Sequence, residues 1–408
     1  MIVAWCRMRD AAMADAGAWL PGVIGAVALA ASLCWFGFSA WFVCRLRPPR
    51  RAAQGRVTLL LCVTGRSAHL PALFAALARQ SLRPRRLVVA VESVSDPACA
   101  QVMELAPGLP FPVEMVIAGT ASHRSQKATN LIAAARRVDA ADEAVVLFDA
   151  DILPPPEWLS WLASPVLRGT WDVVSGYRWQ IAGHGGLARQ TVTWLDRAFA
   201  LAARQLLWRQ VWGGSVAFSA AAFARLDLPT TLERAFSTDA AISRRAKSLA
   251  LRILARRAVL LPTPADGGEK GAIAFQRRQF QLYRLHAPGA FAGLGLILAA
   301  EAGALLLLPA ALAGNDEATG WLAAMLAAGA ARVGLHEWTT HRLGISEPPA
   351  ARLAQLGCGL FSALPALFGL LLVASAARPR RIRWRHVEYE LRGPEEVRVI
   401  ARHAPAGG

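Results

Sequence analysis

The chain has 408 residues, and its 55% hydrophobic content and mean hydropathy of +0.34 are too high for an ordinary soluble domain. Its net charge of +17 raises the possibility of nucleic-acid binding, but the basic residues flank apolar runs and no nucleic-acid motif is present. Contact with anionic lipid explains the surplus better. The six cysteines show neither a CxxC pair nor metal-ligand spacing, which indicates small apolar residues in a reducing compartment.

The N-terminal region carries the first apolar run. Residues 16–44 contain no charge and exceed the roughly 20 residues that cross a bilayer. A cleaved signal peptide is the alternative, but the run is too long and lacks a clear cleavage site. Five arginines follow it, namely Arg45, Arg47, Arg50, Arg51 and Arg56. The positive-inside rule therefore places the residues after this span in the cytoplasm.

A different pattern begins at residue 57. Short apolar runs with the character of buried parallel strands alternate with helical patterns. The predicted strands are residues 57–65, 86–93, 112–119 and 144–151, and the predicted helices are residues 70–80 and 125–138. This alternation predicts an α/β fold with a Rossmann-like, mostly parallel sheet covered by helices on both faces. Ligands bind such sheets beyond the carboxyl ends of the strands.

The following region is mixed and then becomes apolar again. Strand-and-turn segments are predicted at residues 171–179 and 212–219, and a helix within residues 236–251. A basic, aromatic, amphipathic stretch at residues 274–288 suits the membrane interface.

Three apolar runs follow in the C-terminal half. Residues 287–314 and 353–377 are long enough to span a membrane, whereas residues 318–335 are marginal because Arg332 interrupts them. The arginines of the tail favour a cytoplasmic C-terminus, so we expect residues 318–335 to be re-entrant or interfacial.

These patterns predict four regions. An N-terminal transmembrane anchor (residues 1–50) precedes a cytoplasmic catalytic domain that ends in an interfacial helix (residues 51–286). A C-terminal transmembrane region (residues 287–377) precedes a basic cytoplasmic tail (residues 378–408).

The predicted strand 144–151 ends in "FDAD". This motif contains two aspartates, Asp149 and Asp151, separated by one residue. Mg²⁺ typically takes one or two carboxylates together with phosphate oxygens. A simple turn is an equally good interpretation of this motif alone, because Asp favours turns and prolines follow.

Other residues strengthen the metal-site interpretation. Glu92 ends the second strand, and Lys127 and Asn130 lie where a loop becomes a helix, a natural place to meet phosphate. Each has an ordinary structural alternative, such as a solvated strand end or a surface cation. Two glycines follow Trp212 and indicate a tight turn. Asp239 lies at the start of a predicted helix, directly after a Ser-Thr pair that can cap it. In this order on one chain, these residues fit a single site.

From residue 57 to the tail, the chain resembles the membrane-anchored family 2 glycosyltransferases of the GT-A fold, and it is similar to ceramide glucosyltransferases. The resemblance rests on "FDADI", "VSGYRW", "WGGS" and "TDAAISRRA". The closing "RRIRWRHVEYELR" resembles the tails of bacterial members, which implies a multi-pass protein of the bacterial inner membrane.

The resemblance implies a role for each candidate residue. Asp239 would be the general base, and Asp151 would hold Mg²⁺ or Mn²⁺. The nucleotide sugar would be bound by Glu92 at the base, Asp149 at the nucleotide, Lys127 and Asn130 near the diphosphate, and Arg278 with Gln279 at the diphosphate or the closing edge. The acceptor pocket would be shaped by Trp212, Gly213 and Gly214.

Two departures from the family pattern are visible. Glu92 stands where Asp is usual, and "QRRQF" (residues 276–280) replaces the Gln-x-x-Arg-Trp element. The second departure weakens any prediction of processive synthesis. We therefore expect an inverting transferase that moves a sugar, carried by a nucleotide such as UDP, to a ceramide-like or other membrane lipid at the cytoplasmic leaflet. A polysaccharide synthase and an inactive membrane scaffold remain alternatives, and no nucleic-acid partner is expected.

Overall fold

The computed structural model describes residues 2–46, 54–202, 210–264, 267–378 and 380–403. Two compact units divide the chain. The α/β unit comprises Arg45–Ile181, Ala203–Pro264 and Pro379–Gly408, and the helical unit comprises Met1–Cys44, Ala182–Ala202 and Ala265–Arg378. These boundaries differ from the predicted ones, because the tail joins the α/β unit while residues 182–202 and 265–286 join the helical unit. Arg47, Arg50 and Arg51 lie outside the described residues.

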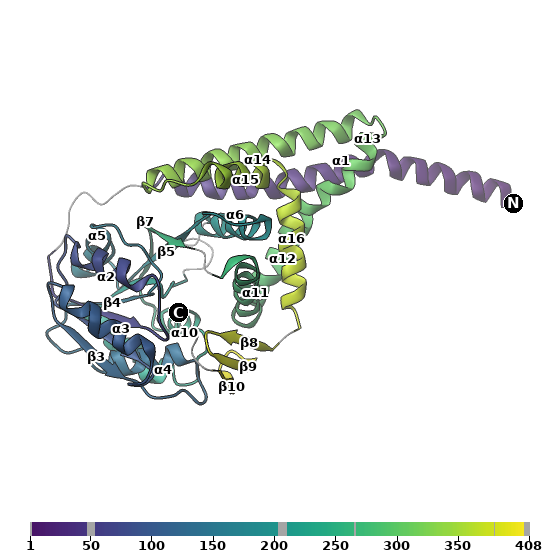
Figure 1. The fold of residues 1–408 in the computed structure, drawn as a ribbon. Helices are drawn as coiled ribbons and strands as arrows, with labels where there is room; N and C mark the ends of the chain where they lie inside the picture. The colour runs from purple at the N-terminus through teal and green to yellow at the C-terminus, as the bar shows by residue number, and fades with distance from the viewer. Residues whose placement is uncertain (1, 47–53, 203–209, 265–266, 379, 404–408) are drawn as a thin grey trace. The chain divides into compact units, whose positions relative to one another are not determined.

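The α/β unit is built on a seven-stranded sheet with the order β3-β2-β1-β4-β6-β5-β7. Figure 1 labels β3, β4, β5 and β7 of this sheet. Neighbouring strands β1, β2, β3 and β4 run parallel, whereas β6 runs antiparallel to both β4 and β5. The strands are β1 Val57–Cys62, β2 Arg86–Val91, β3 Val113–Ile117, β4 Ala144–Phe148, β5 Val173–Ile181, β6 Ser215–Ser219 and β7 Ile253–Pro264. The predicted α/β fold with a mostly parallel sheet is confirmed, and the antiparallel β6 is an addition to it.

Alternating side chains of each central strand supply two cores, one on each face of the sheet. In β1, Leu59 and Leu61 belong to one buried cluster and Leu60 to the other, as the two-residue period of a strand requires. The first cluster is covered by α2 Leu70–Ala78, α3 Pro97–Leu105 and α5 Trp158–Leu167. The second is covered by α4 Gln126–Ala135, α8 Ala220–Leu226, α9 Leu228–Thr231 and α10 Thr238–Ser248. A sheet apolar on both faces explains why its strands are continuous apolar runs.

The tail forms a second, antiparallel sheet of order β10-β9-β8 within the α/β unit. Its strands are β8 Arg381–Trp384, β9 Val387–Gly393 and β10 Glu396–Arg402. Tyr389 and Val387 on β9 are almost fully buried, although the sequence predicted only a basic tail here.

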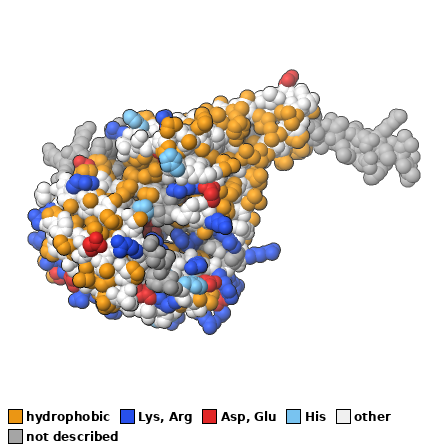
Figure 2. Space-filling model, viewed as in Figure 1, with side chains coloured by type: hydrophobic (Ala, Val, Ile, Leu, Met, Phe, Trp, Pro, Cys, Tyr) orange, Lys and Arg blue, Asp and Glu red, His pale blue; other side chains and the backbone are white. Residues whose placement is uncertain are grey.

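The helical unit contains the apolar runs. Its helices are α1 Ile2–Val43, α6 Leu187–Leu201, α11 Gly268–His286, α12 Pro288–Ala302, α13 Leu308–Leu312, α14 Asp316–Arg342, α15 Pro349–Leu360 and α16 Ala363–Ala376, with a 3₁₀ segment at Gly303–Leu307. Most of the exposed large hydrophobic side chains of the described residues belong to this unit. Figure 2 shows hydrophobic side chains over much of its visible surface. Such a surface is typical of a membrane protein.

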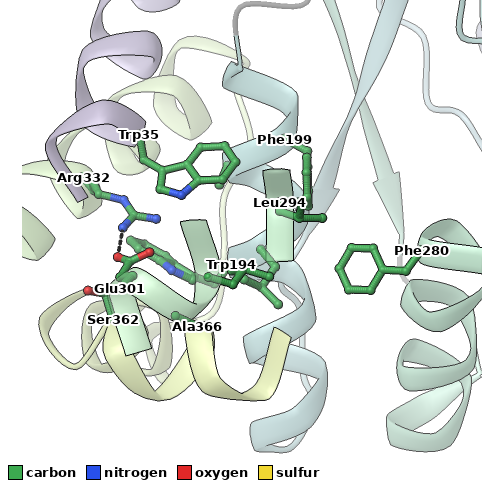
Figure 3. A pocket seen from close by; sticks show the side chains of 12 residues that line it. Trp35, Trp194, Phe199, Phe280, Leu294, Glu301, Arg332, Ser362 and Ala366 are labelled. Carbon is green, nitrogen blue, oxygen red and sulfur yellow. Dashed lines mark hydrogen bonds and ion pairs between the residues drawn. The ribbon is translucent and has the colours of Figure 1, made fainter. Parts of the chain in front are cut away.

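Three helices among the described residues are long and apolar enough to cross a membrane, namely Trp19–Val43, Pro288–Leu312 and Asp316–Arg342. Residues 318–335 lie in the uninterrupted helix α14, and their expected re-entrant or interfacial position stays a prediction. A helix break lies within residues 353–377, where α15 and α16 meet at a bend of 84°. The charge of Arg332, which made this run marginal in the sequence, is balanced by the buried Glu301 of α12, a partner that hydropathy cannot reveal (Figure 3).

Candidate active site

The two aspartates of the sequence motif lie directly after β4, at the carboxyl edge of the sheet. Lys127 in the first turn of α4 reaches them, with its Nζ 2.5 Å from Oδ1 of Asp149. Burial disfavours the ammonium, but the carboxylates of Asp149 and Asp239 raise the pKa of Lys127 above its usual range. A permanent cation is therefore held at this edge, where an anionic ligand would meet it.

Asp151 is partly buried beside Asp149. Burial raises the pKa of Asp151, and the neighbouring charge of Asp149 raises it further. The positive charges of Lys127 and Arg178 oppose this shift. Two carboxylates that repel one another form a favourable place for a cation.

The carboxylates of Asp149 and Asp151 could hold a divalent metal at this edge of the sheet only if phosphate oxygens completed the coordination shell of the metal. No group of three or more His, Cys, Asp or Glu side chains in the described part of the chain is arranged to hold a metal by itself. Mg²⁺ and Mn²⁺ sites that bind nucleotides use one or two carboxylates and take their remaining ligands from phosphate and water. Asp149 and Asp151 supply such a pair.

The turn after residue 211 brings a third acidic side chain to the site. A Cβ atom on Gly213 would lie 2.3 Å from Oδ1 of Asp239, and one on Gly214 would lie 2.2 Å from the Trp212 ring. The backbone N–H of Trp212 donates to Oγ of Ser175 over 2.9 Å, which fixes the turn against β5. A larger residue at either position would require Asp239 or Trp212 to move, and the close approach at Gly213 places Asp239 against this turn.

Asp239 itself lies in the first turn of α10. The side chain of Ser237 caps the helix by accepting from the N–H of Ala240 over 3.3 Å. The hydroxyl of Thr238 donates to Oδ1 of Asp239 over 3.1 Å. The positive end of the helix dipole favours a carboxylate here. The structure thus brings together Asp149, Asp151, Lys127 and Asp239, four of the residues proposed from the sequence.

Asn130 has a different environment from the one expected. Its amide donates to the carbonyls of Val63 and Ala90, both over 3.3 Å, and its oxygen accepts from Nε2 of Gln126 over 2.9 Å. These bonds tie α4 to the ends of β1 and β2. A direct contact between Asn130 and nucleotide stays a prediction, and the structure shows a positioning role for its side chain.

Glu92 is buried by the tail sheet. Nε2 of His386 lies 2.9 Å from its Oε2, and Arg402 of β10 forms an ion pair with its other oxygen. Arg402 also donates to the carbonyl of Ala121 over 2.9 Å. The hydroxyl of Tyr389 accepts from the N–H of Gln126, one residue before Lys127, over 3.0 Å. These bonds attach the tail sheet to the loop before α4 and to the first turn of α4, the helix that carries Lys127.

Four residues at the site were not predicted from the sequence, namely Arg178, His386, Tyr389 and Arg402. Arg178 stands within the quoted "VSGYRW", where a lone cation in a predicted strand was the available signal. The tail residues gave no signal, because their partners lie some three hundred residues away.

Gln276, Arg278 and Gln279 lie on α11 of the helical unit, so their proximity to the carboxylates stays a prediction. The guanidinium of Arg278 stands 5.5 Å from the Phe275 ring centroid, and Gln279 is half-buried. Gln276 is 1% exposed, and its Oε1 has no hydrogen-bond partner among the described residues. A buried acceptor without a donor is costly, which makes Gln276 a candidate for contact with a ligand.

The model of glycosyl transferase family 21 matches residues 23–397. The chain belongs to this family. It is therefore a glycosyltransferase, which confirms the prediction of an enzyme of this class.

Solved structures also resemble the chain. One is a mannosyltransferase from Pyrobaculum calidifontis in complex with GDP-Man and Mn²⁺, at 21% identity and a TM-score of 0.41 over 85% of this chain and 99% of that one. Another is glucosyl-3-phosphoglycerate synthase from Mycobacterium tuberculosis with Mn²⁺ and UDP-glucose, at 14% identity and a TM-score of 0.37 over 56% and 78%. No curated protein matches the chain.

Proposed function

We propose that this family 21 member transfers a sugar from a nucleotide sugar, with UDP as the expected nucleotide, to a membrane lipid at the cytoplasmic leaflet, with inversion at the anomeric carbon. The observation that supports this most directly is the group of Asp149, Asp151, Lys127 and Asp239 at the carboxyl edge of one sheet. The exposed apolar surface of the helical unit supports an acceptor delivered by the bilayer. A ceramide-like acceptor is proposed from the sequence resemblance.

In the proposed reaction, the carboxylate of Asp239 takes the proton of the acceptor hydroxyl. The hydroxyl oxygen then forms a bond to the anomeric carbon as the bond from that carbon to the diphosphate oxygen breaks. General-base help of this kind contributes about 10²–10⁴-fold to the rate. One displacement with one base inverts the configuration.

The leaving nucleoside diphosphate gains negative charge, which the site is built to meet. Nζ of Lys127 supplies a fixed positive charge, and Arg178 adds another near Asp151. Asp149 and Asp151 would hold Mg²⁺ or Mn²⁺ jointly with the diphosphate, and a bound cation supplies further charge stabilisation.

Several observations support a bilayer topology with a cytoplasmic tail. The tail sheet packs within the α/β unit through Glu92 and Gln126, so both must lie on the same side of the membrane. An even number of crossings between α11 and β8 satisfies this condition. Two crossings, by Pro288–Leu312 and Asp316–Arg342, would leave the bent pair of α15 and α16 as the segment that does not cross. We propose the bacterial inner membrane as the location of this protein.

The polysaccharide synthase alternative is weaker. A secretion channel needs more spans than the three helices, or four with the bent pair, of the described residues. The inactive-scaffold alternative conflicts with the family assignment and with the retained carboxylates.

Replacement of the base tests the proposed function. Asp239→Asn should keep nucleotide binding and lower sugar transfer to a lipid extract by about 10²-fold or more. Glu233→Gln, an exposed carboxylate six residues earlier, is the matched control and should transfer normally. Near-normal transfer by the Asp239→Asn variant would remove Asp239 from the mechanism. A parent enzyme that uses no lipid in the extract with any nucleotide sugar would overturn the lipid acceptor.

A further inference from the structure

The first residue of α4 is bound by the tail sheet. The backbone N–H of Gln126 donates to the hydroxyl of Tyr389 on β9 over 3.0 Å. The next residue is Lys127, whose Nζ pairs with Asp149. The first N–H groups of a helix have no partner within the helix, so an acceptor from outside helps to fix where the helix begins. The hydroxyl of Tyr389 therefore holds the backbone directly beside Lys127.

The ring of Tyr389 contacts the segment before α10. It packs edge-to-face against the ring of Phe236, with 5.1 Å between the centroids and 74° between the planes. Phe236 directly precedes Ser237, the cap of α10, and lies three residues before Asp239. Aromatic pairs of this geometry are favourable beyond the area that they bury. One tail residue thus contacts the segments that carry two of the charged groups of the site.

These two segments also bind one another. The backbone N–H of Ser125 donates to the carbonyl of Ala235 over 2.9 Å. The side chain of Ser125 caps α4 by accepting from the N–H of Ala128 over 3.2 Å. Since Ala235 directly precedes Phe236, the bond joins the start of α4 to the start of α10. Tyr389 contacts both sides of this junction.

The burial of Tyr389 suits a positioning role and not proton transfer. The residue is 0% exposed. Burial raises the pKa of its hydroxyl, so the hydroxyl stays neutral at physiological pH. A buried, neutral hydroxyl does not exchange protons with a substrate, but it is a good fixed acceptor for a backbone N–H.

We propose that Tyr389 is a positioning residue for sugar transfer: its ring is anchored against the start of α10, and its hydroxyl holds Lys127 where the nucleoside diphosphate binds. This inference rests on the proposed function, because that function assigns Lys127 to the diphosphate. It gives the C-terminal tail a role in the reaction although no tail residue is proposed to touch the substrate.

The expected effect follows from the N–H that Tyr389→Phe would leave unpaired. Phenylalanine keeps the ring contact with Phe236, so only the hydroxyl is lost. A buried donor without an acceptor has a free-energy cost that corresponds to a shift of about tenfold in an equilibrium. The first turn of α4 should therefore leave its place in most molecules. Apparent affinity falls in proportion to the population that keeps the binding arrangement, so we expect about tenfold weaker binding of nucleoside diphosphate.

Calorimetry on the full-length protein in detergent measures this affinity without an acceptor. The probe is UDP with Mn²⁺, and GDP with Mn²⁺ replaces it if the parent does not bind UDP. Val387→Ala is the matched control, because Val387 is buried on the same strand and on the same face as Tyr389 but does not contact Gln126 through its side chain. The control should lower the melting temperature at least as much as Tyr389→Phe and bind nucleotide as the parent does.

A Lys127→Ala background separates positioning from a general loss of structure. If Tyr389 acts through Lys127, Tyr389→Phe should weaken binding about tenfold in the parent and cause no further loss where Lys127→Ala is already present. Equal losses in the two backgrounds, or no loss in the parent, would overturn the proposal. A loss of the same size in the Val387→Ala control would also overturn it.

The outcomes separate this proposal from the proposed function. A parent that binds the nucleoside diphosphate but glycosylates no membrane lipid would refute lipid transfer, and the affinities of the variants would still decide the role of Tyr389. A parent that glycosylates lipid while Tyr389→Phe binds as tightly as the parent would refute that role and leave the function standing. A parent that binds neither UDP nor GDP would overturn both, because Lys127 would have no diphosphate to meet.

Discussion

Removal of Arg402 should destabilise the α/β unit and release the tail sheet. The guanidinium of Arg402 pairs with Glu92, and it also donates to the carbonyl of Ala121 and to Oε1 of Gln126, over 2.9 and 3.1 Å. An Arg402→Ala substitution would leave the buried carboxylate of Glu92 with His386 as its remaining side-chain partner among the described residues. The tail sheet would lose a major polar attachment to the loop before α4.

The expected cost follows from the exposure of the partners. Breaking a fully buried ion pair by removing one partner costs about 3–5 kcal/mol. The side chain of Glu92 is 10% exposed and that of Arg402 is 27% exposed, and His386 remains, so the cost should be about 2–3 kcal/mol. For a unit of this size, each kcal/mol lowers the melting temperature by about 2–4 °C, so a fall of about 4–12 °C is expected.

Thermal unfolding of the full-length protein in detergent, followed by tryptophan fluorescence, measures this change. Arg398→Ala is the matched control, because Arg398 lies on the same strand, β10, with an exposed side chain. Limited trypsin digestion should remove the tail from the Arg402→Ala variant faster than from the control. Adding Glu92→Gln should recover part of the loss, because the uncharged amide needs no cationic partner.

The result against this prediction would be an Arg402→Ala variant with the same melting temperature as Arg398→Ala and a tail that trypsin removes no faster. That result would mean that the pair with Glu92 contributes nothing measurable. A variant that melts lower but is not rescued by Glu92→Gln would place the loss on the bonds to Ala121 and Gln126 instead.

Three further predictions concern the site and the topology. Asp151→Ala should abolish the metal-dependent part of nucleotide binding, measured by calorimetry with and without Mg²⁺, and an unchanged metal effect would show that Asp151 is not a ligand. Arg278→Ala should lower transfer more than Gln276→Ala, because a guanidinium can bridge two phosphate oxygens; equal or reversed losses would mean that Gln276, Gln279 and Phe280 take the places of the family's Gln, Arg and Trp, and that Arg278 with Gln279 is not the working pair. A single cysteine at the C-terminus, in a background without the native cysteines, should resist a membrane-impermeant thiol reagent in intact cells, and labelling would refute the cytoplasmic tail.

The sequence by itself predicted the core of the α/β unit and much of the candidate site. Apolar runs such as residues 57–65 and 144–151 are local signals, and the carboxyl ends of parallel strands share one edge by geometry. Placing Asp149 and Asp151 at that edge therefore needed no knowledge of strand order. Asp239 followed from its capped helix start after the glycine turn, and Lys127 from its position at the start of a helix.

Only the tertiary structure decided where charged groups find their partners. The charge of Arg332 was the reason to call residues 318–335 a marginal membrane span. In the structure Glu301 on another helix balances this charge, and α14 is unbroken from Asp316 to Arg342. The resemblance implied that Glu92 meets the nucleotide base, with a solvated strand end as the alternative. In the structure its side chain is buried and binds Arg402 from the other end of the chain, and the contact with the base stays a prediction. The cost of burying a charge depends on what lies beside it in space, and residues so distant along the chain become neighbours only when it folds.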